Sequence, residues 1–304
     1  MAKAKKDTAV PAATEEVVSV KGLDHEFKCR GHQFEIGKTY TVEGKVVACQ
    51  NGFHAVDWDN PFHVWDFYPV VDDEGRLTRY AETIQSGQVA RQEDEHKRGT
   101  KIASGSITVK VELSLPEFLK HAVERVIELT KGKGDDPSGD SARIGSSGNS
   151  AQIGSSGDYA QIGSSGDSAR IGSSGDYARI GSSGDYAQIG SSGDYAQIGS
   201  SGYSAQIGSS GYSARIGSSG DSARIGSSGD SARIDASGDG TVVASAGINA
   251  RVKAKAGTWV SVAEFDQSIP PKCIGFATGK VGEDGIPADT WLIAKGGKLV
   301  PENA

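Results

Sequence analysis

The sequence predicts a mainly β protein, in which a parallel β-solenoid or β-roll of nine-residue repeats follows a small N-terminal α+β domain and precedes a β-rich C-terminal cap. Three observations lead to this fold class. Units such as DSARIGSSG recur every nine residues from Asp140, with an isoleucine at one position from Ile144 to Ile234. Between Gly139 and Gly238 lie 22 of the 42 glycines. Only 36% of the 304 residues are apolar and 7% aromatic, which is too little for a single large core.

Residues 1–22 are expected to form a disordered lead. The lysines near the N-terminus have no apolar stretch behind them, so this segment is not a secretory signal. No run of about 18 apolar residues occurs, so no membrane span is expected. The net charge of −7 argues against a nucleic-acid or anionic-membrane binder. Three widely spaced cysteines suit free thiols in a reducing cytoplasm better than a disulfide framework.

Residues 23–135 are expected to form the α+β domain. Asn60 and Pro61 provide the cap and first-turn proline of a short helix that ends near Phe67. Ser114 and Glu117 form a capping box, and the helix that follows should pack its apolar face on a sheet or on the first solenoid coil. The predicted strands are Phe27–Arg30, Thr39–Val42, Lys45–Cys49, Tyr80–Ile84 and Ile107–Leu113.

Residues 136–262 are expected to form the solenoid. Each unit contains Ala-(Arg/Gln)-Ile, a short strand whose alanine and isoleucine point to one face, and a Gly-Ser-Ser-Gly turn whose glycines can take positive φ. With two units per turn, residues 18 apart stack. Tyr159, Tyr177 and Tyr195 should then form an aromatic ladder, and Tyr186 should lie on the opposite sheet.

Calcium-binding nonapeptide rolls share this period, but here the aspartate comes one position early and tyrosine replaces it in two units, so no cofactor is expected. The nearly balanced Asp and Arg content does not support DNA mimicry, and Asp and Arg three residues apart are expected to pair weakly. The string SAQIGSSG is similar to the head repeats of trimeric bacterial adhesins, which supports the packing and not a function.

Residues 263–304 are expected to form the β-rich cap, and each flanking module should cover one end of the solenoid.

Two sets of residues are candidate sites. Cys29, His32, Cys49 and His54 have tolerable spacing for a zinc site, but buried thiols at strand ends are the favoured interpretation of the cysteines and zinc is the alternative. Exposed tyrosines can bind a sugar ring or a partner protein, or can only reinforce cross-strand packing. These tyrosines are Tyr159, Tyr177, Tyr186, Tyr195, Tyr203 and Tyr212.

The segments CRGHQFEIGKTY (29–40), ACQNGFHA (48–55), FYP (67–69) and IASGSITVKVELSL (102–115) together resemble an uncharacterised family of phage- and prophage-encoded proteins. GTWVSVAEF (257–265) and ADTWLIAKGGK (288–298) resemble the closing segment of that family. The resemblance implies a phage origin and brings no established activity.

Arg30, His54 and Glu82 loosely resemble the order of an arginine, a polar residue of a middle strand and a glutamate in ADP-ribosyltransferases. That resemblance implies an arginine that orients NAD phosphates and a glutamate that positions the ribose, but no second carboxylate precedes Glu82 at the usual spacing.

The sequence therefore favours a non-enzymatic phage accessory protein, a rigid binding or structural module of the virion or of the host cytoplasm during infection. Its partner is expected to be a protein or glycan, a homo-oligomer is possible, and nucleic acid and membrane are not expected partners. The alternative is a nucleotide-acting, ADP-ribosyltransferase-like enzyme in which the solenoid is a spacer.

Overall fold

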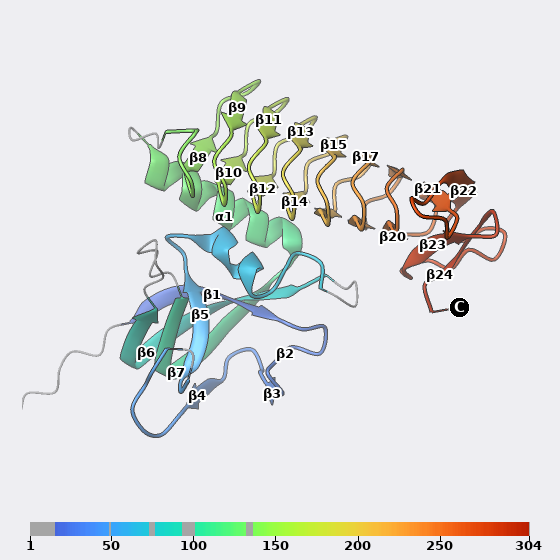
Figure 1. Ribbon diagram of the computed structural model, residues 1–304. Coiled ribbons are helices and arrows are strands. Elements are labelled where there is room, and N and C mark those ends of the chain that lie inside the picture. Colours follow the sequence, from blue (N-terminus) through green and yellow to red (C-terminus); the bar gives the residue numbers. More distant parts are fainter. Residues whose placement is uncertain (1–15, 49, 73–76, 93–100, 132–135, 304) are drawn as a thin grey trace, which may run out of the picture.

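The computed structural model describes residues 16–48, 50–72, 77–92, 101–131 and 136–303. A small N-terminal domain lies along one side of a long β-solenoid, and a β-rich cap ends the solenoid (Figure 1). This architecture confirms the predicted fold class. Among the described residues, no helix is both long and apolar enough to cross a membrane.

A five-stranded sheet with the order β4-β7-β5-β1-β6 builds the N-terminal domain. The two longest strands, β6 and β7, also pair with each other, so β7, β5, β1 and β6 close into a ring. A separate two-stranded hairpin, β2–β3, follows β1. The strands are β1 (Val17–Leu23), β2 (Lys28–Cys29), β3 (His32–Gln33), β4 (Thr39–Thr41), β5 (Phe53–Asp57), β6 (Arg79–Gln92) and β7 (Lys101–Leu113).

Strand β1 corrects one expected boundary. Residues 17–22 were expected in the disordered lead, yet they lie between β5 and β6 in the sheet, and residues 1–15 lie outside the described residues. The buried hydroxyls of Ser19 and Thr83 lie 2.8 Å apart across this pairing. The expected strand Lys45–Cys49 is a second difference. Val47 makes only an isolated bridge with Asn51, and Cys49 lies outside the described residues.

Two helices connect the domain to the solenoid. The 3₁₀ helix η1 (Pro61–Asp66) follows Asn60, whose side chain makes no capping hydrogen bond. The α-helix α1 (Leu115–Thr130) begins after Ser114 and has the predicted capping box. The Ser114 N–H donates to the Glu117 carboxylate at 2.8 Å, and the Glu117 N–H donates to the Ser114 hydroxyl at 3.5 Å.

The solenoid has two nine-residue units per turn, as predicted. Successive strands therefore alternate between two parallel sheets, and residues 18 apart are paired, as in Ile144, Ile162 and Ile180. Alanine and isoleucine of both sheets fill the interior. We call one sheet the covered sheet: β8 (Arg143–Ser146), β10 (Gln161–Ser164), β12 (Arg179–Ser182), β14 (Gln197–Ser200), β16 (Arg215–Ser218), β18 (Arg233–Ala236) and β20 (Arg251–Ala254). We call the other the uncovered sheet: β9 (Gln152–Ser155), β11 (Arg170–Ser173), β13 (Gln188–Ser191), β15 (Gln206–Ser209), β17 (Arg224–Ser227), β19 (Val242–Ser245) and β21 (Trp259–Phe265).

The repeat turns use their residues differently from what we expected. In the regular units, the left-handed residue is the serine or tyrosine before the alanine, as in Ser168 and Tyr177 with φ of 57° and 55°, and not a glycine of the Gly-Ser-Ser-Gly turn. The second glycine of that turn is required by close approach instead. A Cβ on Gly175 would overlap the carbonyl group of Gly157, one turn before it, and the same contact recurs along the solenoid.

The repeat aspartates also have a role that we did not expect. The carboxylate accepts a hydrogen bond from the backbone N–H one turn later, as Asp158 does from Asp176 at 2.8 Å. Asp140, Asp167, Asp176, Asp185, Asp194, Asp221 and Asp230 make the same bond. These carboxylates therefore link successive turns by charge-assisted hydrogen bonds.

The N-terminal domain packs along the side of the solenoid, and not over its end as we expected. Helix α1 lies against β8, β10, β12 and β14 of the covered sheet (Figure 1). Glycines leave room for it, because a Cβ on Gly199 would lie 3.0 Å from Leu119 and 3.2 Å from Trp65. Burial of this apolar contact fixes the domain on the covered sheet.

The C-terminal cap is β-rich, and it continues both sheets of the solenoid. Strand β22 (Cys273–Lys280) pairs with β21, and β23 (Leu292–Lys295) pairs with β20 and with β24 (Lys298–Pro301). The cap pairs the last strand edges of the solenoid, which would otherwise expose unpaired backbone groups.

Candidate functional site

The tyrosines form two columns along the turns of the solenoid. Tyr159, Tyr177 and Tyr195 stack with ring centroids 5.0 and 4.9 Å apart and planes 7° from parallel, which confirms the predicted ladder. Tyr212 meets Tyr195 edge to face at 5.6 Å. On the other edge, Tyr186 meets Tyr203 edge to face at 5.8 Å. The tyrosines therefore border both long edges of the uncovered sheet.

The outer face of the uncovered sheet has a floor of glycine. Within the described part of the chain, nothing lies within 4 Å of a Cβ built on Gly154, Gly172 or Gly226. Polar side chains such as Arg170 and Gln188 line one side of this floor, and the second serine of each turn lines the other. This face is a shallow groove along the solenoid.

One end of this groove is apolar. Val242 and Trp259 are paired neighbours on the uncovered sheet, and Phe276 on β22 pairs with Ala263, four residues farther along β21. Their side chains are 46%, 52% and 56% exposed. Clustered large apolar side chains at the surface are typical of interaction sites.

The N-terminal domain contains a separate pocket of about 760 Å³. Its wall comes from β1, the β2–β3 hairpin, β5, η1 and the start of β7. Cationic side chains from three of these elements line it: Lys21, Arg30 and Lys101. Its aromatic lining consists of Phe34, Phe53, Phe67 and Tyr68, with His32 and His54 beside them.

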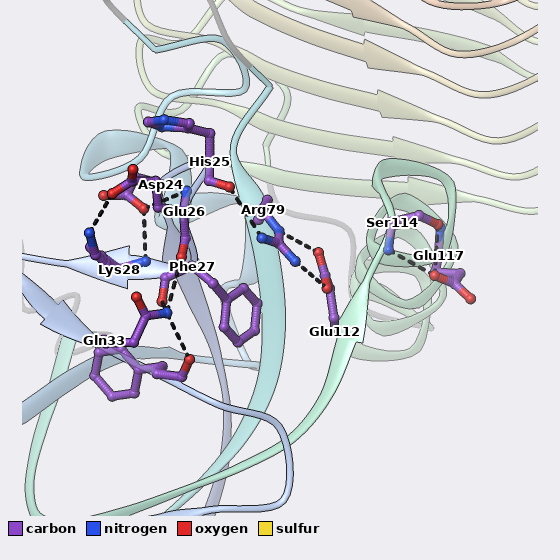
Figure 2. A network of polar contacts seen from close by, with 11 residues as sticks. Asp24, His25, Glu26, Phe27, Lys28, Gln33, Arg79, Glu112, Ser114 and Glu117 are labelled. Carbon is purple, nitrogen blue, oxygen red and sulfur yellow. Dashed lines mark hydrogen bonds and ion pairs between the residues drawn. The ribbon is translucent and has the colours of Figure 1, made fainter.

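Polar contacts hold the hairpin that carries Arg30 (Figure 2). The Asp24 carboxylate accepts the backbone N–H groups of Glu26 and Lys28 at 3.0 and 2.7 Å. The Arg79 guanidinium lies 4.6 Å from the ring centre of Phe27 and makes a forked pair with Glu112 at 2.6 and 2.7 Å. These contacts tie the turn to β6 and β7, so the hairpin has a fixed position beside the pocket.

Lys21 is the buried cation of the pocket, with 3% of its surface exposed. Its ammonium donates to the His54 carbonyl oxygen at 2.7 Å, and Tyr68 donates from its hydroxyl to the Cys29 sulfur at 2.7 Å. Burial lowers the pKa of Lys21 from its usual value, although the neighbouring Cys29 opposes this shift. For His54, burial and then the charges of Lys101, Lys21 and Arg30 lower the pKa to about 4. The His54 ring is therefore neutral at pH 7.

The zinc candidates do not form a metal site among the described residues, which contain no group of three or more His, Cys, Asp or Glu side chains arranged for a metal ion. Cys29 accepts the Tyr68 hydroxyl, and His32 packs edge to face on Phe34 and Tyr40. Cys49 lies outside the described residues.

The three residues suggested by the ADP-ribosyltransferase resemblance divide between two places. Arg30 and His54 both line the pocket. Glu82 is paired with Val20 on β1 and lines a small depression with Trp58 and His121. In the described part of the chain, Asp66 supplies the carboxylate that lines the pocket, and it accepts hydrogen bonds from His63 and Arg179.

The outward Arg and Gln positions of the covered sheet have a role that the sequence did not reveal. Arg179 is 1% exposed and forms an ion pair with Asp66 of η1. Gln197 accepts the Val70 N–H at 3.3 Å and donates to the Trp65 carbonyl oxygen at 3.2 Å. In sequence they match Arg170 and Gln188 of the uncovered sheet, so no local signal distinguishes them.

Comparison with known proteins assigns one part of the chain to a protein family. A search of curated proteins and a search of solved structures each returned no match. Residues 17–121, which include β1, the pocket and the first half of α1, match the family model described as "Domain of unknown function (DUF7666)". The N-terminal domain thus carries a DUF7666 domain, a member of an uncharacterised family.

Proposed function

We propose that this protein is a non-enzymatic phage accessory protein that acts as a rigid binding module, in the virion or in the infected host cell. The phage origin rests on the resemblance of its motifs. The binding role is supported by one observation on the uncovered sheet. Its glycine floor and its exposed aromatic end lie on one continuous face. The occupant that fits this face is an amphipathic helix of a partner protein.

The chain itself supports a helix as the occupant. Both sheets are built from the same repeat, so both have a column of glycines on their outer face. On the covered sheet, α1 lies over that column, with Val123 and Val126 at contact distance from a Cβ built on Gly163. The glycine groove of the uncovered sheet has the same form, so it can receive a helix in the same way.

Two features define the chemistry of that helix. The exposed Trp259 and Phe276 are of the residue class that dominates interface energies when it becomes buried, so the helix should place apolar residues over them. The uncovered sheet also presents Arg170 and Arg224, which favour acidic residues beside the apolar stripe.

The proposal is tested with a defined helix. A labelled peptide of residues 114–131, the sequence of α1, is titrated with the full-length protein and followed by fluorescence anisotropy. We expect saturable binding with a Kd below about 1 mM. Gly190→Glu, which fills the open groove, and Trp259→Ala should each weaken binding about fivefold or more.

The matched control is Lys110→Glu, which introduces the same carboxylate at an exposed position of β7 and should leave binding unchanged. Circular dichroism confirms that each variant keeps its β content. Binding that does not saturate, or binding by Gly190→Glu as tight as that of the parent protein, would contradict the helix-docking face.

The tyrosine columns are tested with substitutions that the repeat itself supplies. Serine is the usual residue where Tyr186 stands, and aspartate is usual where Tyr203 stands. Tyr186→Ser with Tyr203→Asp should therefore preserve the solenoid. If these tyrosines extend the binding face, the double variant weakens peptide binding. If they serve only packing, it lowers the melting temperature and leaves binding unchanged.

The alternative of a nucleotide-acting enzyme has less support. It requires a carboxylate in the pocket with Arg30 and His54, and Glu82 lines a different depression. Asp66 lines the pocket, but its oxygens are engaged by His63 and Arg179.

A further inference from the structure

The pocket of the N-terminal domain carries an excess of positive charge. Lys21, Arg30 and Lys101 line it from β1, the β2–β3 hairpin and β7. Among the described residues that line the pocket, the carboxylate is Asp66, which already accepts hydrogen bonds from His63 and Arg179. The buried Lys21 ammonium donates to the His54 carbonyl oxygen, an acceptor without net charge, so its positive charge remains in the pocket. The pocket is therefore poised to bind an anion.

The effect of these cations is visible at His54. After burial, the charges of Lys101, Lys21 and Arg30 are the causes that lower the pKa of His54, which falls to about 4. A bound anion would oppose the same charges. The imidazole of His54 is thus a built-in reporter of anion binding.

The same pocket has an aromatic wall. His32 lies edge to face against Phe34 at 4.7 Å and Phe53 at 5.7 Å between ring centroids. Phe67 lines the wall as well, and the Lys101 ammonium lies 4.4 Å from its ring centre. Aromatic rings beside cations suit a ligand that has both a planar ring and a negative charge.

The size of the pocket agrees with a small ligand. Its volume of about 760 Å³ lies within the range of roughly 300–1,000 Å³ of small-molecule sites. We propose that this pocket binds a small aromatic anion, a planar ring carrying a phosphate or carboxylate, with the anion held by Arg30 and Lys101 and the ring held by the aromatic wall. This site is distinct from the uncovered sheet, and its ligand is independent of the helix proposed to dock there.

Isothermal titration of the full-length protein tests the proposal with defined probes. Phenyl phosphate, benzoate and adenosine 5′-monophosphate combine a ring with an anion, inorganic phosphate supplies the anion alone, and adenosine supplies the ring alone. We expect at least one aromatic anion to bind about tenfold or more tightly than inorganic phosphate and adenosine. Phosphate and carboxylate probes also distinguish the two anion types.

Variants of the pocket residues then test where in the protein the probe binds. Arg30→Gln and Lys101→Gln should each weaken binding of that probe about tenfold, as expected for loss of a charge-assisted hydrogen bond. Lys120→Gln removes an exposed charge on α1 and should have no effect. The NMR titration of the His54 imidazole should move to a higher pKa when the probe is bound.

Three outcomes would overturn the site. No aromatic anion binds with a Kd below about 10 mM, or inorganic phosphate binds as tightly as the aromatic anions. The third is that Arg30→Gln and Lys101→Gln both bind the aromatic anion as tightly as the parent protein does. Gly190→Glu blocks the groove of the uncovered sheet and should leave probe binding intact. Failure of helix docking and failure of the pocket are thus separate results.

Discussion

At the scale of single residues, the same amino acid in the same repeat position has two different roles. Gly181 and Gly190 both follow a repeat isoleucine, yet a Cβ on Gly181 would overlap the Phe62 ring, whereas a Cβ on Gly190 has only the Ile171 carbonyl oxygen near it, at 3.9 Å. The difference arises from the domain that lies over one sheet and not the other. Stability measurements on matched variants should reveal it.

We expect Gly181→Ala to lower the free energy of unfolding by about 1–3 kcal/mol, because the methyl group overpacks the contact with η1. Gly190→Ala should be neutral or stabilising by up to about 1 kcal/mol, because it restricts the unfolded chain at an open position. Urea unfolding of the two variants provides the comparison. Equal losses in both would contradict the docked arrangement of the domain.

His54 gives a pH-dependent prediction. Its pKa is about 4 in the folded protein and 6.5 in its ordinary state, so the unfolded chain binds the proton more readily between these values. The neutral ring therefore contributes stability above about pH 6.5, and this contribution is lost as the pH falls toward 4. The free energy of unfolding lost on His54→Gln should be smaller at pH 4.5 than at pH 7. A loss that is equal at both values, or larger at pH 4.5, would show that the ring is not held neutral.

At the scale of elements, the contact between η1 and the covered sheet depends on Arg179 and Asp66. Burial opposes ionisation of Asp66, but the hydrogen bond from His63 and the charge of Arg179 outweigh it, so the pKa of Asp66 lies below its usual value. The ion pair thus stabilises the fold at neutral pH, and its contribution is lost as the pH falls through that lowered pKa.

Arg179→Gln introduces the residue found at the same position in β10 and β14. We expect it to cost about 1.5–3 kcal/mol, because Asp66 loses a charged hydrogen-bond partner in a largely buried contact. Arg170→Gln makes the same change at an exposed position of the uncovered sheet and should stay within about 0.5 kcal/mol. Chemical denaturation measures the free energy of unfolding of both variants. A large loss of stability on Arg170→Gln would mean that the repeat itself requires arginine.

At the scale of the whole molecule, stability should come from packing and turn-to-turn hydrogen bonds, and not from a metal. The described residues contain no cluster of His, Cys, Asp and Glu that could hold a metal ion, and the repeat aspartates accept backbone N–H groups of the next turn. A chelator should therefore leave the melting temperature unchanged, since removing a ligand that binds only the folded state would lower it. A fall of several degrees on adding EDTA, reversed by zinc or calcium, would identify a structural metal.

The sequence determined the features that repeat or that depend on neighbours in the chain. The nine-residue period fixes two sheets and an 18-residue stacking distance, so the ladder of Tyr159, Tyr177 and Tyr195 could be predicted. The capping box of α1 was equally local. In the candidate pocket, Arg30 and His54 were identified as residues of interest, but Lys21 and Lys101 were not.

Only the tertiary structure decided which sheet is covered and where the pocket closes. Strand β1 pairs with β5, more than 30 residues away, so no local pattern revealed that Lys21 would lie beside His54 in the pocket. The two sheets present nearly identical outer faces, and the repeat alone cannot distinguish them. The packing of α1 and η1 on one face breaks this symmetry, burying Arg179 and leaving Arg170 exposed. That long-range burial, and not the local sequence, gives each face its role.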